Sequence, residues 1–439
     1  NGEDSLLRSV TKRIRLQARP DACLAGIDSA AQILNKIEQI RDTQSMYGKR
    51  PSDLYARQWE STEQETSGEI PSANGDVNGE VKHQNTSLSF SVMQFNTLAE
   101  GLSAGPSVQT PFPIMSDDSN SKGTTRQKDI TRGGNNFGGF TKLPNPEVTL
   151  DFALRRWRLL EVILSNYDHP QEQQQPVIVN GDSSAIDGIG RFDLMAMEEV
   201  DRYHGFFEPA LKLFGYSGLF VPKPSSPGTK LGWYSDGCAL FWKESCFKLL
   251  SEERKRFNDG TQVYIVATLQ HIPSAQTIVV AVAHLKAQNS DVNEKIRTKQ
   301  ADQLVASVHE VTTEVAAVND VLVDDVPIII LGDLNSELST GFGKTCVRSI
   351  LNRNEQPKFW SAYPIDPMKT YGMYSTWKTR GEKTVRRIID YIFHNKELHC
   401  THVLSIPKET DVEPERLPGF RYPSDHLMIG AKYHLNRNE

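Results

Sequence analysis

The sequence VPIIILGDLNSE (326–337) decides how this chain folds. Its apolar run has the length and the β-branched residues of a buried strand, and it ends in Asp333 and Asn335. Polar side chains at strand ends lie at the edge of a sheet, where several such ends can converge on one cleft. The same arrangement recurs along the chain: Asn96 follows SVMQF, Glu199 lies in MAMEEVD, His284 follows TIVVAVA, and Asp425 and His426 lie in YPSDH.

A carboxylate also lies inside an apolar run, because Asp390 is the central polar residue of RRIIDYIF (386–393). An unpaired charge in a buried strand costs several kcal/mol, so Asp390 needs a partner, and a histidine is an obvious one. Taken singly, an Asn or Asp after a strand is most often a turn residue, and a lone histidine is most often a satisfied core residue. Only the ordered set of these residues indicates a site.

Strand-like and helical segments alternate from residue 88 onward. LSFSVMQFN (88–96) alternates as a half-buried strand does, and DFALRRWRLLEVILSN (151–166) places its apolar residues on one helical face. A second long helix is predicted over 293–315. Many further apolar runs and no detectable repeat predict an α/β protein in which packed sheets are flanked by helices.

The first part of the chain differs from the rest in composition. Residues 5–19 contain five basic and no acidic side chains, as both mitochondrial presequences and solvated basic helices do. Residues 24–46 have the spacing of an amphipathic helix, and the polar stretch from 51 to 87 is nearly without large apolar residues. The predicted units are a basic and helical appendage (1–50), a disordered linker (51–87) and a main domain (88–436) with surface loops at 101–148 and 171–191.

Composition excludes several classes of protein. No apolar run approaches the roughly 20 residues that cross a bilayer, and a net charge of -6 argues against coating nucleic acid by bulk charge. The five cysteines lack the close spacing of zinc sites, so reduced thiols are expected. We therefore expect a monomer inside the cell, in the cytoplasm, with the mitochondrion as an alternative.

The ordered set N, E, HLK, GDxN, DY and SDH across residues 88–436 resembles the endonuclease/exonuclease/phosphatase superfamily. VPKPSSP (221–227) and HLKA (284–287) narrow the resemblance to its deadenylase-like branch and, within that branch, to the nocturnin family. The resemblance implies that 88–436 is a catalytic domain. It also implies a four-layer α-β-β-α sandwich of two packed mixed sheets flanked by helices.

The resemblance further implies a site for Mg²⁺ on Glu199, supported by Asn96, with Asp425 in the outer shell of the metal. Magnesium prefers oxygen ligands, which a carboxylate and an amide supply. Asp333 would orient or deprotonate the attacking water, and Asn335 would fix that water or a phosphate oxygen. The remaining implied catalytic groups stabilise the phosphoryl group in the transition state: His426 held by Asp390, with His284 and Lys286 as donors.

Two substrates fit this resemblance. The nocturnin family implies removal of the 2′-phosphate of NADP(H) to give NAD(H), whereas the deadenylases cut poly(A) RNA from its 3′ end and release 5′-AMP. A catalytically silent member that binds RNA or protein is a third hypothesis, opposed by the presence of every expected metal and acid/base residue. The predicted substrate-binding residues are Lys223, Pro224, Ser225, Thr261, His284, Lys286, Ala287, Asp333, Asn335 and His426. For Lys223, a solvated surface lysine is the alternative.

Three residues depart from the family pattern. Glu198 stands where Gln is common before the metal-binding Glu, so two adjacent glutamates compete for that role. The match to E-V-D and the alternation of the strand favour Glu199. Ser225 replaces a Trp and Gln288 replaces an Arg, and the loss of a ring and a charge would weaken dinucleotide binding.

Overall fold

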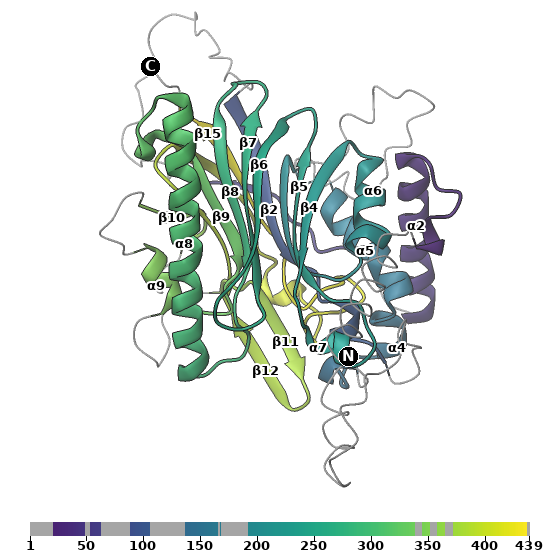
Figure 1. Ribbon diagram of the computed structural model, residues 1–439. Helices are drawn as coiled ribbons and strands as arrows, with labels where there is room; N and C mark the ends of the chain where they lie inside the picture. Colours follow the sequence, from purple (N-terminus) through teal and green to yellow (C-terminus); the bar gives the residue numbers. More distant parts are fainter. Residues whose placement is uncertain are drawn as a thin grey trace, which may run out of the picture.

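A computed structural model describes residues 21–48, 53–62, 88–105, 137–165, 167, 192–338, 345–351, 358–364 and 372–436. Two β-sheets pack face to face, and helices cover both outer faces (Figure 1). The predicted four-layer α-β-β-α sandwich is confirmed. The basic segment 5–19, the insertion 171–191 and much of the predicted loop 101–148 lie outside the described residues.

The first sheet has seven strands in the order β1-β14-β15-β2-β3-β5-β4. Its parallel pair, β2 with β3, brings the carboxyl ends of both strands to one edge, because Asn96 pairs with Glu198 there. Their neighbours β15 and β5 run antiparallel to them. The strands are β1 (Trp59–Ser61), β2 (Ser89–Asn96), β3 (Leu194–Val200), β4 (Tyr216–Pro222), β5 (Gly237–Lys243), β14 (Leu398–Leu404) and β15 (Ile429–Leu435).

The second sheet has six strands in the order β10-β13-β9-β8-β7-β6. Here β8 and β9 are the parallel pair, with His284 opposite Asp333, and β13 runs antiparallel to β9, with Asp390 opposite Asp333. These strands are β6 (Phe247–Arg256), β7 (Val263–His271), β8 (Thr277–His284), β9 (Ile328–Asp333), β10 (Trp360–Ser361) and β13 (Asp390–His394). A separate hairpin consists of β11 (Thr376–Arg380) and β12 (Lys383–Arg387).

Both long helices predicted in the main domain are confirmed. Asp151 caps α5 by accepting a hydrogen bond from the Ala153 N–H, and Ser290 caps α8 by accepting from the Asn293 N–H. The helices on the seven-stranded sheet are α2 (Ala30–Gly48), α5 (Phe152–Leu164) and α6 (Glu208–Lys212); those on the six-stranded sheet are α8 (Asp291–Asn319) and α9 (Cys346–Leu351) (Figure 1). Two short helices, α4 (Pro146–Thr149) and α7 (Pro227–Lys230), lie in connections. None of the helices in the described residues is both long and apolar enough to span a bilayer.

Alternation along the strands separates three apolar layers. In β2, Val92 faces the other sheet, whereas Met93 and Phe95 face the helices. In β9, Leu331 faces the other sheet and Ile330 packs beneath α8. Because side chains alternate with a period of two, the residue that continues the inner row at each strand end also points between the sheets.

The predicted disordered linker is wrong for residues 53–62. This segment, which we call the strap, lies across the main domain, and its strand β1 pairs with β14 of the seven-stranded sheet. Composition missed it because the strap is short and its buried side chains include the polar ends of Tyr55 and Arg57. Helix α2, predicted as an amphipathic helix over 24–46, packs on α5 through Ile33 and Ile37.

The five cysteines are all free thiols, as their spacing predicts.

Candidate active site

Strand alternation gathers the polar residues at one end of the space between the sheets. The inner row of β2 continues from Val92 through Gln94 to Asn96. The same parity continues from apolar inner residues to His284 on β8, Asp333 on β9 and Asp390 on β13. All of these side chains are buried, with exposed fractions of 3% or less. The apolar layer between the sheets therefore ends in a polar cluster.

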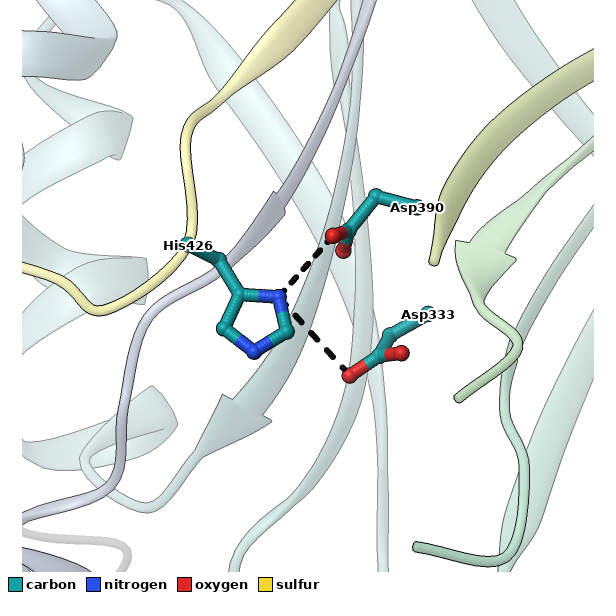
Figure 2. Close-up of side chains that lie close together, drawn as sticks. All are labelled: Asp333, Asp390 and His426. Atoms are coloured by element: carbon teal, nitrogen blue, oxygen red, sulfur yellow. Dashed lines mark hydrogen bonds and ion pairs between the residues drawn. The ribbon is translucent and has the colours of Figure 1, made fainter. Parts of the chain in front are cut away.

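His426 lies at the centre of this cluster (Figure 2). Its Nδ1 is 2.9 Å from Asp390 Oδ2 and 3.9 Å from Asp333 Oδ2, so the histidine that Asp390 was predicted to need is His426. Gln94 stabilises the far side of Asp390, because its Nε2 donates to Asp390 Oδ1 at 2.9 Å. The Asn96 amide donates to Asp333 Oδ2 at 3.0 Å. Side chains from both sheets thus meet in one network.

The two carboxylates give this network an acid and a base. Burial opposes charge on His426, but the carboxylates of Asp390, Asp333 and Asp425 together outweigh it and raise the pKa of the imidazole to about 9. Burial and then the neighbouring Asp390 raise the pKa of Asp333 to about 6. At neutral pH the histidine is therefore a cation beside an ionised Asp333, an arrangement suited to proton transfer and to binding an anion.

A bulge at the end of β3 decides how its two glutamates are used. Alternation continues from Leu194 and Ala196 to Glu198, which is fully buried and accepts a hydrogen bond from Gln94 Nε2 at 2.7 Å. The alternation argument for Glu199 is therefore wrong. Glu199 instead has a positive φ of 54° where β3 shifts register against β5. That conformation costs a non-glycine residue about 1–3 kcal/mol, and such strain is concentrated at functional sites.

The crowding of carboxylates fits a site for a cation. Burial, with Asp390 and Asp333 nearby, raises the pKa of Glu198 well above its usual value. Glu199 is only half-buried, and its Oε2 accepts a single long hydrogen bond among the described residues, from the Ala99 N–H at 3.4 Å. Its carboxylate therefore keeps lone pairs with which to ligate a metal, as the chemistry of Mg²⁺ requires.

Asp333, Asp390 and His426 each offer an atom within 4.8 Å of the others, close enough to hold an ion together. The bond from His426 Nδ1 to Asp390 argues against this use, because a protonated imidazole has no lone pair left for a metal. We therefore assign the trio to acid/base chemistry.

Basic side chains surround the cluster on two sides. Lys223 is 7% exposed, forms a buried ion pair with Asp236, and lies 3.4 Å from His284 Nδ1. The predicted alternative of a solvated Lys223 is therefore wrong. Burial, then Lys223 and His426, lowers the pKa of His284 well below its usual value, so His284 is neutral.

On the other side, the β11 hairpin contacts the SDH segment. Lys378 Nζ lies 2.6 Å from Asp425 Oδ2 and 3.2 Å from His426 Nε2, and Arg380 donates to the same Asp425 oxygen at 3.0 Å. Burial alone would raise the pKa of Asp425, but Lys378, His426 and Arg380 together hold it below its usual range. Asp425 thus anchors two cations beside the cluster, whereas sequence reasoning assigned it to a metal shell.

Of the other predicted site residues, Asn335 lies in the centre: it has a φ of 52°, and its N–H donates to Asp333 Oδ1. The remaining ones lie farther out. Lys286 is half-buried, with its N–H donating to Gln300 Oε1. No polar contact within the described residues joins the following to the cluster: Pro224, Ser225, Thr261 and Ala287.

Sequence reasoning missed Gln94, Asp236 and Lys378. The first two follow from parity, because Gln94 continues the inner row of Val92 and Asp236 continues that of Cys238. The role of Lys378 had no local signal, since its hairpin reaches the site only in the folded chain.

The sandwich is that of the endonuclease/exonuclease/phosphatase fold. Residues 153–426 match the model of the endonuclease/exonuclease/phosphatase family, and the chain belongs to that family.

Similar sequences and a solved structure confirm the resemblance to nocturnins. Nocturnin of Rattus norvegicus is 34% identical over 251 residues, which are 56% of this chain and 55% of the relative. A CCR4-Not complex 3′-5′-exoribonuclease subunit of Vairimorpha ceranae is 25% identical over 273 residues, 56% of this chain and 55% of the relative. The chain thus matches about half the length of these relatives. The structure of the human Nocturnin catalytic domain with bound sulfate is similar in fold, with a TM-score of 0.52 and 22% identity over 87% of this chain and 97% of that one.

Proposed function

We propose that this chain is a Mg²⁺-dependent phosphoesterase that removes the 2′-phosphate of NADP(H) and leaves NAD(H). The observation that supports hydrolysis most directly is the buried contact of His426 with Asp390, 2.9 Å apart, with Asp333 beside them. The similarity to nocturnins supports the choice of substrate.

In this proposal Asp333 orients the attacking water and takes its proton. The water oxygen bonds to phosphorus, the bond from phosphorus to the ribose 2′ oxygen breaks, and that oxygen takes a proton from solvent, to which Asp333 later returns the proton that it accepted. Cationic His426 stabilises the negative charge that spreads over the phosphoryl oxygens. Asn335, whose backbone is already bonded to Asp333, fixes the water or a phosphate oxygen.

Glu199 and Asn96 are the proposed residues for Mg²⁺, and Asp425 remains a proposed outer-shell group. The ion would supply neutralisation of phosphate charge. The fit rests on the half-buried Glu199 carboxylate and on the excess of buried acidic groups around it.

For recognition of the substrate, we assign a phosphate contact to Lys223, which lies beside His284 at the centre. Lys286 and His284 donate to phosphoryl oxygens. The proposed outer contacts of the dinucleotide are Pro224, Ser225, Thr261 and Ala287.

A second candidate is 3′-exonuclease activity on poly(A) RNA. The similarity to a CCR4-Not exoribonuclease subunit favours it, because the same strand-end residues serve a phosphodiester equally well. The hypothesis of a catalytically silent protein that binds RNA or protein is weaker, since the expected acid/base residues form buried contacts with one another.

The deciding experiment compares phosphate release from NADPH with 5′-AMP release from oligo(A), in one protein sample with and without added Mg²⁺. We expect phosphate release that disappears with a chelator and in Glu199→Ala, while the variant keeps the thermal stability of the wild type. Shortening of oligo(A) by a protein that leaves NADPH intact would establish the second candidate instead. Full activity with excess chelator would refute the metal assignment.

A further inference from the structure

The strap (53–62) packs over the segment of the chain that contains His426. We propose that Arg57 is a positioning residue: it fixes the loop 421–428 so that His426 stays aligned with Asp390. The inference deepens the proposed function and rests on it, because it concerns the same site. The strap lies outside residues 153–426, the range that the family model matches.

Arg57 joins the end of this loop to the residue that follows β14. It is 2% exposed, its Nε donates to the Ser405 carbonyl at 2.7 Å, and its Nη1 donates to the Met428 carbonyl at 2.6 Å. Met428 is two residues after His426. Hydrogen bonds from a charged group to buried carbonyls are the strong kind, so this contact restrains the end of the loop.

The strap restrains the start of the loop as well. The ring of Tyr55 stacks on that of Tyr422, with centroids 5.8 Å apart and planes within 7°. The Tyr422 hydroxyl in turn accepts from the Met428 N–H at 2.9 Å. Arg421 donates to the Asp53 carbonyl at 2.9 Å. Both ends of the loop are thus bound to the strap and to each other.

On its inner side the same loop is held by β2 and by Ser375, which directly precedes the β11 hairpin. Ser424 Oγ donates to the Asn96 carbonyl at 2.6 Å, and the Leu427 N–H donates to the Ser375 carbonyl at 2.6 Å. His426 therefore lies between an inner set of bonds from β2 and Ser375 and an outer set from the strap. Removing the outer set leaves the loop free to move by fractions of an ångström, and a misplacement of about 1 Å at a reacting group costs on the order of 100-fold in rate.

The chain offers a control at a matched position. Tyr363 is also buried, and its hydroxyl oxygen lies 2.8 Å from the Leu404 carbonyl and 2.9 Å from the Gly430 carbonyl, so it can donate to one of them. It thus bridges the same two segments as Arg57, one residue earlier in the first and two residues later in the second. Tyr363→Phe removes buried hydrogen bonding of a neutral hydroxyl, farther from His426 than the contacts of Arg57.

The test compares Arg57→Met, Arg57→Lys and Tyr363→Phe in the full chain, well below each melting temperature. For Arg57→Met we expect kcat to fall by about 10- to 100-fold with KM within about two-fold, and Arg57→Lys to recover part of the loss. Tyr363→Phe should lose thermal stability and keep kcat. Hydrogen exchange of peptides covering 421–428 should rise in Arg57→Met, rise less in Arg57→Lys and stay unchanged in Tyr363→Phe.

A purely structural role predicts the opposite pattern, in which the Arg57 variants and Tyr363→Phe lose stability alike and retain kcat. That result, or unchanged exchange over 421–428 in Arg57→Met, overturns the proposal. Should Arg57→Met fail to fold, the comparison of Arg57→Lys with Tyr363→Phe decides by the same readouts. If the wild type hydrolyses neither substrate, the proposed function falls, and the exchange measurement alone decides whether the strap orders this loop.

Discussion

The two loops that carry the proposed catalytic groups are supported in different ways. The loop after β9 (333–337) is supported by α8: Glu294 accepts from Ser336 Oγ and from the Cys346 N–H, each at 2.8 Å. Arg297, paired with Glu294, donates to the Lys286 carbonyl at 2.8 Å. The loop 421–428 is supported instead by the strap, whose Arg57 is separated from Met428 by 371 positions.

This difference indicates that the two loops of the site depend on different parts of the chain. The α8 support is a fully buried ion pair inside the family-matched range, so its loss affects the fold of the whole domain. The strap forms the edge strand of the seven-stranded sheet, where it pairs with β14, and it also holds the loop 421–428, so its loss affects the alignment of that loop first. Stability and turnover should therefore respond differently to changes in the two supports.

The largest expected effect comes from removing the N-terminal elements stepwise. A chain that starts at residue 53 loses α2 but keeps the strap, whereas one that starts at residue 63 loses both. Burial of an apolar side chain contributes about 1.5–3 kcal/mol, so loss of Ile33, Ile37 and Tyr55 together is comparable to a typical total stability of about 5–15 kcal/mol.

We expect the chain from residue 53 to be less stable with nearly normal kcat, and the chain from residue 63 to be weakly active or unfolded. Denaturant titration and kcat of the two chains check this. Equal kcat in both would show that the strap is dispensable for turnover.

The next effect concerns the α8 support. Glu294→Gln keeps an acceptor for Ser336 but presents no charge to the buried Arg297, and breaking such a pair costs about 3–5 kcal/mol. The free energy of unfolding should fall by that amount in urea. The control Asp291→Asn, an exposed partner of Lys295 on the same helix, should cost less than about 1 kcal/mol. Equal losses in the two variants would contradict the assignment.

A smaller effect is expected from Lys223, which contacts neither support. Lys223→Ala should lower kcat/KM for NADPH, mainly through weaker binding, because a charge-assisted hydrogen bond to phosphate is lost. The loss should correspond to about 1.5–3 kcal/mol of transition-state stabilisation. It should also lower stability, since Asp236 stays buried without its partner. The double variant Lys223→Ala/Asp236→Asn should regain stability and leave kcat/KM low. Recovery of kcat/KM as well would mean that Lys223 serves the fold alone.

The smallest effect is expected from Tyr55→Phe. The stacked ring remains, and only the hydroxyl contact with Glu413 Oε2 at 3.3 Å is lost. This hydrogen bond is long, so its contribution should lie in the typical range of about 0.5–1.5 kcal/mol, and the shift in unfolding free energy should stay within that range. A drop in kcat comparable with that of Arg57→Met would assign the positioning role to Tyr55 instead.

The sequence by itself determined the sandwich and most of its polar cluster. Alternation in a strand is local, so Asn96, His284 and Asp333 had to point the same way as the inner apolar residues of their own strands. The need of Asp390 for a partner also followed from its apolar neighbours, because an isolated charge in a strand is costly.

Only the tertiary structure decided the other features. The bulge that turns Glu199 away from regular alternation depends on the register of β3 against β5, which no single strand specifies. The pairing of Lys223 with Asp236 and the contact of Lys378 with His426 join separate strands or loops. The strap is the clearest example, since Arg57 finds its partners, the Ser405 and Met428 carbonyls, only in the folded chain. Such contacts are set by packing between distant segments, and packing leaves no periodic signal in the sequence.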